Sequence, residues 1–311
     1  MPEEEYVWLE REHLLHFEEI SRVVDAFTTL GVDKVRLTGG EPLLRKDLAQ
    51  LVALLAAKPA LHDLALTTNA MLLADQAAAL KDAGLKRLNV SLDTLQPGRF
   101  KTLTRQDEHD RVMAGVRAAV ALFGHIKVDT VVMRGVNDDE IEALLDFGAT
   151  IAAEIRFIEY MDVAGATHWS RDLVVPRREI LERLRARHGE IQPVGEPDST
   201  APADRYRLPD GRVFGVISST TEPFCRTCDR ARLTADGVFF TCLYATAGLA
   251  LRDRLRAGAT SDELAALVAD RWRIRADQGA EERLASRDRT VFLPVSALRA
   301  DPHLEMHKRG G

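Results

Sequence analysis

Strand-like and helix-like segments alternate through the first part of the chain, roughly one pair every 30 residues. Apolar or alternating runs predict strands at 34–38, 64–69, 87–93, 127–133 and 154–161. Segments with apolar residues at helical spacing follow these runs, so the pattern predicts a parallel sheet with right-handed crossovers. Polar residues gather where each predicted strand ends, which is the edge that forms the active-site mouth of an α/β barrel.

The pattern changes in the last third of the chain. One further helix is predicted at 176–187, and residues 195–203 have the composition of a linker. Short strands are predicted beyond it, starting at 205–217. We therefore predict a partial barrel over residues 1–195 and a smaller α+β domain over residues 196–311.

The chain contains three cysteines, and all of them lie in the predicted second domain. A C-x2-C pair followed by a third cysteine across a hairpin-length gap suits an iron–sulfur cluster or zinc, and leaves one metal position unfilled. A disulfide would leave one thiol over, and buried apolar cysteines would explain the spacing poorly, but both remain alternatives. The three residues are Cys225, Cys228 and Cys242.

Cations occupy several predicted strands and the segment that follows the cysteine pair. Each could be an ordinary salt-bridge partner, but unpaired cations are costly to bury inside a barrel. Together they predict a binding site for a polyphosphate. The six residues are Lys34, Arg36, Lys127, Arg156, Arg230 and Arg232.

Two glycines and an acid follow the first predicted strand, as Gly39-Gly40-Glu41-Pro42. The run can serve as a plain βα turn, because glycine permits unusual dihedral angles and proline starts a helix well. Alternatively, its backbone carbonyls and the Glu41 carboxylate receive the ammonium group of a ligand.

The overall composition excludes several classes of function. A formal net charge of −6 and a pI near 5.9 argue against a general nucleic-acid or membrane-surface binder. No apolar run reaches the roughly 18 residues that span a bilayer, and the acidic first residues lack the features of a signal peptide. We expect a cytoplasmic protein, because thiols stay reduced there.

Several segments, considered together, resemble one family nearly from end to end. They are residues 1–4 (MPEE), 36–43 (RLTGGEPL), 67–69 (TTN), 90–93 (VSLD), 132–138 (VMRGVND), 157–161 (FIEYM), 225–242 and 310–311 (GG). In these motifs the chain resembles the GTP 3′,8-cyclase (MoaA) family of molybdenum cofactor biosynthesis, which belongs to the radical S-adenosylmethionine (SAM) enzymes.

The resemblance implies a fold and an activity. The fold is an incomplete (βα)6-type radical SAM barrel whose first strand is missing, followed by a smaller α+β C-terminal domain that carries a cluster site. The activity is a lyase reaction that converts GTP to 3′,8-cyclo-7,8-dihydro-GTP. A 5′-deoxyadenosyl radical takes the ribose 3′-hydrogen, and the resulting carbon radical attacks guanine C8.

The resemblance also implies roles for particular residues. The ligands of a C-terminal [4Fe–4S] cluster, whose free iron binds guanine, match Cys225, Cys228 and Cys242. The positions that contact GTP match Arg36, Thr67, Lys127, Arg230 and Arg232, with Lys34 and Arg156 as neighbours. The positions that contact SAM match Gly39, Gly40, Glu41, Ser91 and Met161. A tail that reaches into the active site and takes part in the chemistry matches Gly310 and Gly311.

One departure from the family pattern bears on activity. In the family, a first strand and a C-x3-C-x2-C loop precede the residues that Met1-Pro2 resembles, and this loop holds the cluster that cleaves SAM. No cysteine precedes Cys225. We therefore expect the 311 residues to be inactive, though with the C-terminal cluster and weak GTP binding, and the N-terminal [4Fe–4S] cluster only in a full-length form. A start codon placed too late explains this best; a shortened chain and a natural non-catalytic relative are the alternatives.

Two other functions stay open. One is a non-catalytic protein that binds GTP or a cluster. The other is a zinc deaminase, because Pro223-x-Cys225-x-x-Cys228 is similar to half of the deaminase motif, although the required H-x-E upstream is missing. For the cyclase, the expected partners are GTP, a reductant and, functionally, the downstream cyclic pyranopterin monophosphate synthase, with a homodimer left open.

Overall fold

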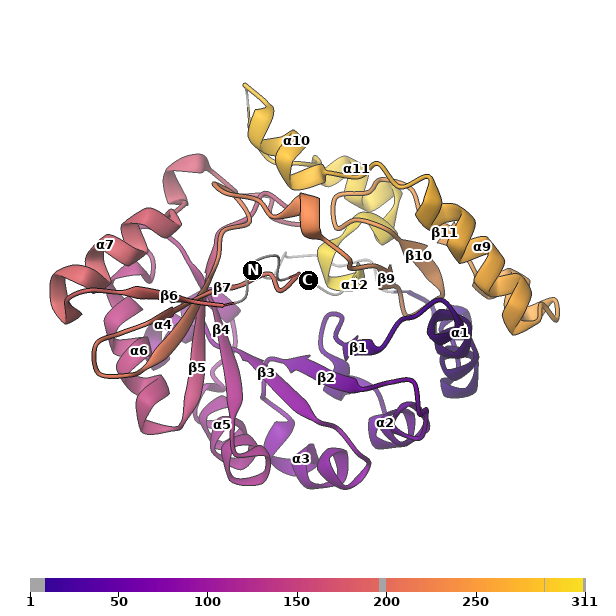
Figure 1. The fold of residues 1–311 in the computed structure, drawn as a ribbon, viewed down its shortest axis with the longest axis horizontal. Coiled ribbons are helices and arrows are strands. Elements are labelled where there is room, and N and C mark those ends of the chain that lie inside the picture. Colours follow the sequence, from indigo (N-terminus) through magenta and orange to yellow (C-terminus); the bar gives the residue numbers. More distant parts are fainter. Residues whose placement is uncertain (1–8, 196–199, 288, 310–311) are drawn as a thin grey trace.

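The computed structural model describes residues 9–195, 200–287 and 289–309. Its largest element is an eight-stranded sheet in the order β1-β2-β3-β4-β5-β8-β7-β6 (Figure 1). Neighbouring strands from β1 to β5, and β5 with β8, pair in parallel. The parallel strands are Lys34–Leu37 (β1), Asp63–Thr68 (β2), Arg87–Ser91 (β3), Ile126–Val132 (β4), Ala153–Glu159 (β5) and Val213–Ile217 (β8). They fan around a common centre in Figure 1, and the predicted barrel-like α/β fold is confirmed.

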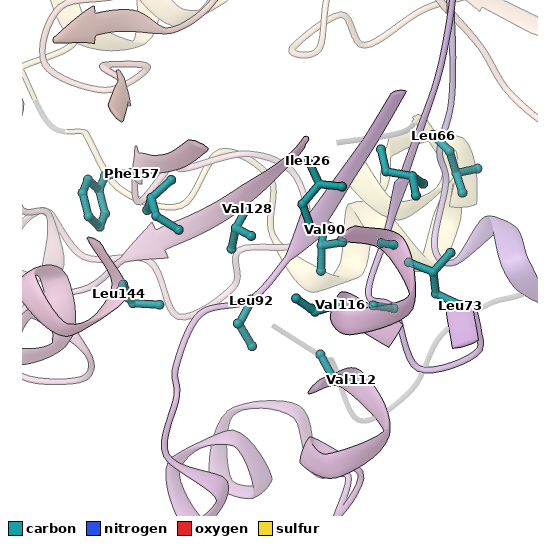
Figure 2. Close-up of a cluster of buried hydrophobic side chains, with 14 of the residues drawn as sticks. Leu66, Leu73, Val90, Leu92, Val112, Val116, Ile126, Val128, Leu144 and Phe157 are labelled. Atoms are coloured by element: carbon teal, nitrogen blue, oxygen red, sulfur yellow. The ribbon is translucent and has the colours of Figure 1, made fainter. Parts of the chain in front are cut away.

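Helices cover the outer face of this sheet. Alternate side chains of β4, such as Ile126 and Val128, are buried against them, whereas Lys127 and Asp129 lie on the inner face. Figure 2 shows part of this main core, with strand residues such as Val90 facing helix residues such as Val116. The outer helices are Leu48–Ala56 (α2), Leu73–Asp82 (α3), Pro97–Thr104 (α4), His109–Phe123 (α5), Ile141–Thr150 (α6) and Arg177–His188 (α7).

The large sheet continues past the end of the predicted barrel domain. Strand β8 pairs in parallel with β5 and antiparallel with β7 (Asp204–Arg207), which in turn pairs with β6 (Gln192–Val194). The predicted division at residue 195 therefore falls inside one continuous sheet. A division of the chain into two domains stays a prediction, with the cysteine region beyond β8 as its second part.

The cysteine region is built on a small antiparallel sheet in the order β11-β10-β9. In Figure 1 this region lies over the side of the barrel next to β1. Its strands are Arg232–Leu233 (β9), Val238–Phe240 (β10) and Leu249–Ala250 (β11). Its helices are Arg252–Arg256 (α8), Ser261–Arg273 (α9), Gly279–Ala285 (α10), Val295–Ala300 (α11) and Met306–Arg309 (α12).

Helix α1 (Phe17–Thr29) joins the two parts of the molecule. Its Val24 packs into the main core, whereas Val23 belongs to a second core with Phe239 and Leu264. One amphipathic helix therefore holds the small sheet and α9 against the barrel.

Most predicted elements occur within a few residues of their expected bounds, but β6, α4, α10, α11 and α12 were not predicted. Short 3-10 helices occupy Arg11–His13 (η1), Pro42–Leu44 (η2), Asp138–Glu140 (η3), Arg171–Leu173 (η4), Cys225–Thr227 (η5) and Pro302–Leu304 (η6). Within the described ranges, no helix combines the length and the apolar character needed to cross a bilayer.

Candidate functional site

A group of cations lies on the inner face of the barrel strands. Arg36 on β1 donates from Nη1 to Thr67 Oγ1 on β2 at 2.9 Å. The Arg36 side chain is open to solvent, yet enough protein surrounds it that burial lowers the pKa of its guanidinium, against the opposing charge of Asp129. Lys34 lies two residues earlier on the same face, opposite Asp63. The structure thus brings together two predicted site residues, Arg36 on β1 and Thr67 on β2.

Lys127 on β4 and Arg156 on β5 extend this group. Burial, helped by the positive charge of Arg156, lowers the pKa of Lys127 to about 8. Arg156 is almost fully buried and donates from Nε to Glu154 Oε1 at 2.9 Å. Gly215 on β8 leaves room for this side chain, because a Cβ there would lie 3.2 Å from Arg156 Cγ. The predicted barrel cations therefore form one group.

Carboxylates lie among these cations, and sequence reasoning missed them. Glu154 is buried between Arg156 and Arg205, whose Nη2 lies 2.8 Å from its Oε2. Asp129 lies opposite Arg156 in the strand register and accepts a hydrogen bond from Asn89 Nδ2 at 2.7 Å. An acid two positions from a strand cation lies on the same face, and this is the signal that could have found Asp129.

Glu41, in the loop after β1, supports the ends of two strands. Its Oε1 accepts from Thr68 Oγ1 at 2.8 Å and from the Leu43 backbone N–H at 3.0 Å. Its Oε2 accepts from the Asn69 backbone N–H at 2.7 Å. Burial raises the pKa of this carboxyl, against the effect of these donors. Both oxygens already have intramolecular donors, so contact of the carboxylate with a ligand ammonium stays a prediction.

The other predicted SAM residues also lie at the carboxyl ends of parallel strands. Gly39 has φ of +134°, which glycine adopts readily, and a Cβ there would lie 3.8 Å from the carbonyl oxygen of His307 in α12. Gly40 and Ser91 are exposed, and Met161 is half-buried just after β5. This edge of a parallel barrel is where ligands bind, but contact with SAM stays a prediction.

The three thiols are free and half-buried, so the disulfide and the buried apolar alternatives are both wrong. Cys225 begins η5, Cys228 follows it and Cys242 follows β10. Each thiol has a nitrogen donor. Arg230 Nη2 lies 3.2 Å from Cys228 Sγ, and the Tyr244 backbone N–H lies 3.4 Å from Cys242 Sγ.

Cys225 receives its hydrogen bonds from the first turn of α10. The backbone N–H groups of Ala280 and Glu281 donate to its sulfur, yet burial is the larger effect and raises the pKa of the thiol. At Cys228 burial also acts to raise the pKa, but the backbone and guanidinium N–H groups of Arg230 outweigh it and lower the pKa. Donors of this kind stabilise thiolate ligands.

Guanidinium groups border the thiols. Arg230 stacks over the Phe224 ring, with its Cζ 4.7 Å from the centroid. Arg232 Nε is buried, and burial lowers the pKa of this group. In the described part of the chain, Arg232 has no hydrogen-bond or ion-pair partner.

Sequence reasoning missed two more arginines at this site. Arg275 Nη1 donates to the carbonyl of Cys228 at 2.7 Å. Arg309, the last residue of α12, is buried over the Phe240 ring and donates to the carbonyl of Leu243 at 3.0 Å. No local spacing marks either arginine, because both reach the cysteines from distant parts of the chain.

The thiol spacing favours a group larger than one metal ion. Around a single tetrahedral zinc with bonds of about 2.3 Å, neighbouring sulfurs would lie about 3.8 Å apart. Among the described residues, the three Sγ atoms do not all lie within 4.8 Å of one another, and the one set of candidate ligands that does is the exposed group of Glu10, Glu12 and His13. Three spaced thiols with N–H donors fit an iron–sulfur cluster better than zinc.

Two connections link the cysteine site to the barrel mouth. Helix α12 contacts Gly39 through His307 and the Cys242 loop through Arg309. A second connection runs through Asp162, directly after Met161, to Tyr244. The predicted catalytic residues Gly310 and Gly311 lie outside the described residues.

Comparison with known proteins agrees with this arrangement. The family model described as the Radical SAM superfamily matches residues 6–148, and the one described as Molybdenum Cofactor Synthesis C matches residues 153–281. GTP 3′,8-cyclase 1 of Mycobacterium tuberculosis (strain CDC 1551 / Oshkosh) is 58% identical over 316 residues, covering 100% of this chain and 88% of the relative.

More distant relatives carry the same name. The GTP 3′,8-cyclase of Acidothermus cellulolyticus is 47% identical over 91% of this chain and 80% of its own length. That of Streptomyces coelicolor is 46% identical over 88% of this chain and 80% of its own length. Among solved structures, a radical SAM methyltransferase from Sphaerobacter thermophilus is similar over 55% of this chain and 54% of its own, with a TM-score of 0.45 and 17% identity.

Proposed function

The chain belongs to the GTP 3′,8-cyclase family, and we propose that it serves the conversion of GTP to 3′,8-cyclo-7,8-dihydro-GTP in molybdenum cofactor biosynthesis. The observation that carries this proposal is the set of three free thiols beside Arg232, whose side chain has no hydrogen-bond or ion-pair partner among the described residues. An anionic cluster and an anionic substrate both complement that charge.

The cysteine site would hold one end of the substrate. A [4Fe–4S] cluster on Cys225, Cys228 and Cys242 would supply an iron with an open position for a ligand atom. Arg230 and Arg232 border the thiols, and their N–H groups can orient a bound purine by hydrogen bonds. This assigns the base of GTP to the C-terminal side of the site.

The barrel cations would hold the triphosphate. The positive charge of Arg156 acts to lower the pKa values of both Arg36 and Lys127, as expected of a shared charge cluster. A bound polyphosphate would favour the charged form of Lys127 and raise its pKa from about 8. Thr67 holds Arg36 in place through its hydroxyl.

SAM is proposed to bind at the neighbouring strand ends, by the glycine loop, Ser91 and Met161. The 311 residues contain no cysteine beyond Cys225, Cys228 and Cys242, so they offer no second set of thiolates for the cluster that cleaves SAM. An electron donor and an enzyme that consumes the cyclic product would be functional partners. A cytoplasmic location, where thiols stay reduced, is part of the same proposal.

Calorimetry of GTP binding tests the proposal. The chain is reconstituted with iron and sulfide without oxygen, and is titrated with GTP and with ATP, both before and after cluster loading. We expect the loaded chain to bind GTP at least about tenfold tighter than ATP, because a site built around specific polar contacts rejects the wrong base. Equal affinity for both nucleotides, or no effect of the cluster, would contradict the proposal.

A chromatographic assay for 5′-deoxyadenosine tests the expectation about SAM cleavage. The loaded chain is incubated with SAM, GTP and dithionite. Because the 311 residues offer only one thiolate set, we expect no 5′-deoxyadenosine. Its formation would show that SAM cleavage does not need the missing cysteines.

A further inference from the structure

Asp162 accepts four hydrogen bonds at the barrel mouth. It is fully buried just after β5, and Oδ1 accepts from Tyr244 Oη at 3.1 Å and from Arg289 Nη2 at 2.7 Å. Its Oδ2 accepts from Arg283 Nε and Arg289 Nε, both at 2.8 Å. All four donors come from the C-terminal part of the chain. This carboxylate therefore ties one barrel strand to the cysteine region.

Tyr244 connects Asp162 to two of the three cysteines. Its backbone N–H donates to Cys242 Sγ at 3.4 Å, so the tyrosine belongs to the loop that presents this thiol. Its ring lies against α10, because a Cβ on Gly279 would stand 2.4 Å from the Tyr244 Cβ. The next two residues of α10 are those whose N–H groups donate to Cys225. A shift of Tyr244 would therefore affect the surroundings of both Cys225 and Cys242.

The same carboxylate is next to a predicted SAM residue. Met161 and Asp162 are consecutive, so their Cα atoms are about 3.8 Å apart and cannot move independently. Arg289 adds a further tie, since its Nη1 donates to the Thr220 carbonyl at 2.9 Å beyond β8. The bridge thus runs from the barrel strand ends to the Cys242 loop without passing through any residue assigned to GTP.

We propose that Asp162 and Tyr244 are a positioning pair that fixes the Cys242 loop against the end of β5. The pair sets where a GTP held at the cysteine site lies relative to Met161, and this role rests on the proposed function. Neither residue is assigned a contact with a reacting atom. A displacement of about 1 Å in such a site can lower the reaction rate about a hundredfold, so a rigid bridge would help to keep the substrate in position.

The variant Tyr244→Phe tests the pair in the cluster-loaded chain. It removes one hydroxyl, keeps the ring against Gly279, and leaves Asp162 with its three arginine donors, so the fold is expected to persist with Tm lower by about 2 °C. We expect an unchanged iron content, GTP binding about fivefold weaker, and shifted EPR g values of the reduced cluster in the presence of GTP.

Tyr206→Phe is the matched control. Tyr206 on β7 is half-buried, stacks on Phe214 and places its hydroxyl beside Arg177, but it belongs to the far end of the large sheet. It is expected to leave both GTP affinity and the EPR spectrum unchanged. Asp162→Asn would act in the same direction as Tyr244→Phe but leaves two half-buried arginines without their countercharge, so Tyr244→Phe is the more specific test.

The outcomes separate the two proposals. If the wild-type chain binds GTP and Tyr244→Phe shows the same affinity and the same spectrum, the positioning role is overturned while the proposed function stands. Loss of iron from Tyr244→Phe also overturns it, because the pair would then retain the cluster rather than position it. Absence of GTP binding by the loaded wild-type chain is a failure of the proposed function itself.

Discussion

The barrel lumen and the cysteine site both collect cations, and the two groups differ in how their arginines are paired. Arg156 pairs with Glu154 at 2.9 Å, and Asp129 lies within the same group. At the cysteine site, the arginines 230, 232, 275 and 309 form no ion pair with a carboxylate in the described ranges of the chain. Their bonds go to sulfur and to carbonyl oxygens. Arg156 in the lumen is therefore balanced without a ligand, whereas these four arginines of the cysteine site have no carboxylate partner among the described residues.

This difference indicates where ligand binding contributes most. A buried cation without a countercharge costs stability, and an anion that binds there removes the cost. In the lumen, a triphosphate has to share Arg156 with Glu154, which already pairs with it. An anionic cluster on the three thiolates would therefore gain from the unpaired arginines around it.

Cys228→Ser should have the largest effect on the cysteine site. We expect the iron bound after reconstitution to fall from about four atoms per chain to near zero, because two thiolates cannot hold the cluster. Iron and sulfide analysis measures this. Thr227→Ser, an exposed change between the two cysteines of the pair, should leave the iron content unchanged. Full iron and sulfide in Cys228→Ser would disprove the ligand assignment.

Glu154→Gln should destabilise the balanced lumen. The carboxylate is buried with Arg156, so removing its charge leaves a buried cation and is expected to cost about 3 kcal/mol. Its half-exposed partner Arg205 adds little. Urea unfolding of the ligand-free chain measures the loss, with exposed Glu190→Gln as a control that stays within about 0.5 kcal/mol. Equal stability of both variants would show that the lumen is not held by its ion pairs.

Arg232→Ala should do the opposite in the unbalanced site. Because Arg232 has no partner among the described residues, its removal should leave the stability of the ligand-free chain unchanged or higher. GTP binding by the loaded chain should weaken about 30-fold, the value of a hydrogen bond to a charged group. Arg178→Ala, whose side chain is 82% exposed, is the calorimetric control. A strongly destabilised Arg232→Ala with normal affinity would reverse the comparison.

The smallest expected effect is the pH dependence that Lys127 gives to GTP binding. Its pKa of about 8 in the free protein means that it is charged below pH 8 and loses the proton above it. An anion favours the charged form, so affinity should be flat up to about pH 8 and then fall by at most about tenfold per pH unit. Lys127→Arg keeps its charge and should abolish the fall between pH 7 and 9. The same fall in both proteins would assign it to another group.

The sequence predicts the barrel well, because its strands and helices follow local apolar periodicity. Helix α4 escaped prediction because Phe100 is its only buried residue, which gives no apolar stripe. The return of β8 to pair with β5 could not be predicted, because it joins strands more than 50 residues apart and no local pattern records such pairing.

The candidate site was predictable where spacing carries the information. The C-x2-C spacing of Cys225 and Cys228 indicated a shared site, and strand alternation indicated the inward cations. The carboxylates that balance those cations, and the bridge from Asp162 to Tyr244, depend on contacts between distant segments. For Glu41 the local motif was less informative than the fold. The motif indicated contact with a ligand, whereas in the structure N–H and O–H groups of the protein itself donate to the carboxylate.

The most direct measurement is the hyperfine coupling between the reduced C-terminal cluster and GTP labelled with nitrogen-15 in the base. The chain is reconstituted, reduced and saturated with labelled GTP, and nuclear–electron double resonance is recorded. If Cys225, Cys228 and Cys242 hold a cluster with an open iron, we expect a nitrogen-15 coupling that labelled ATP does not give. No coupling at saturating GTP, or the same coupling with ATP, would contradict a guanine-binding cluster at this site.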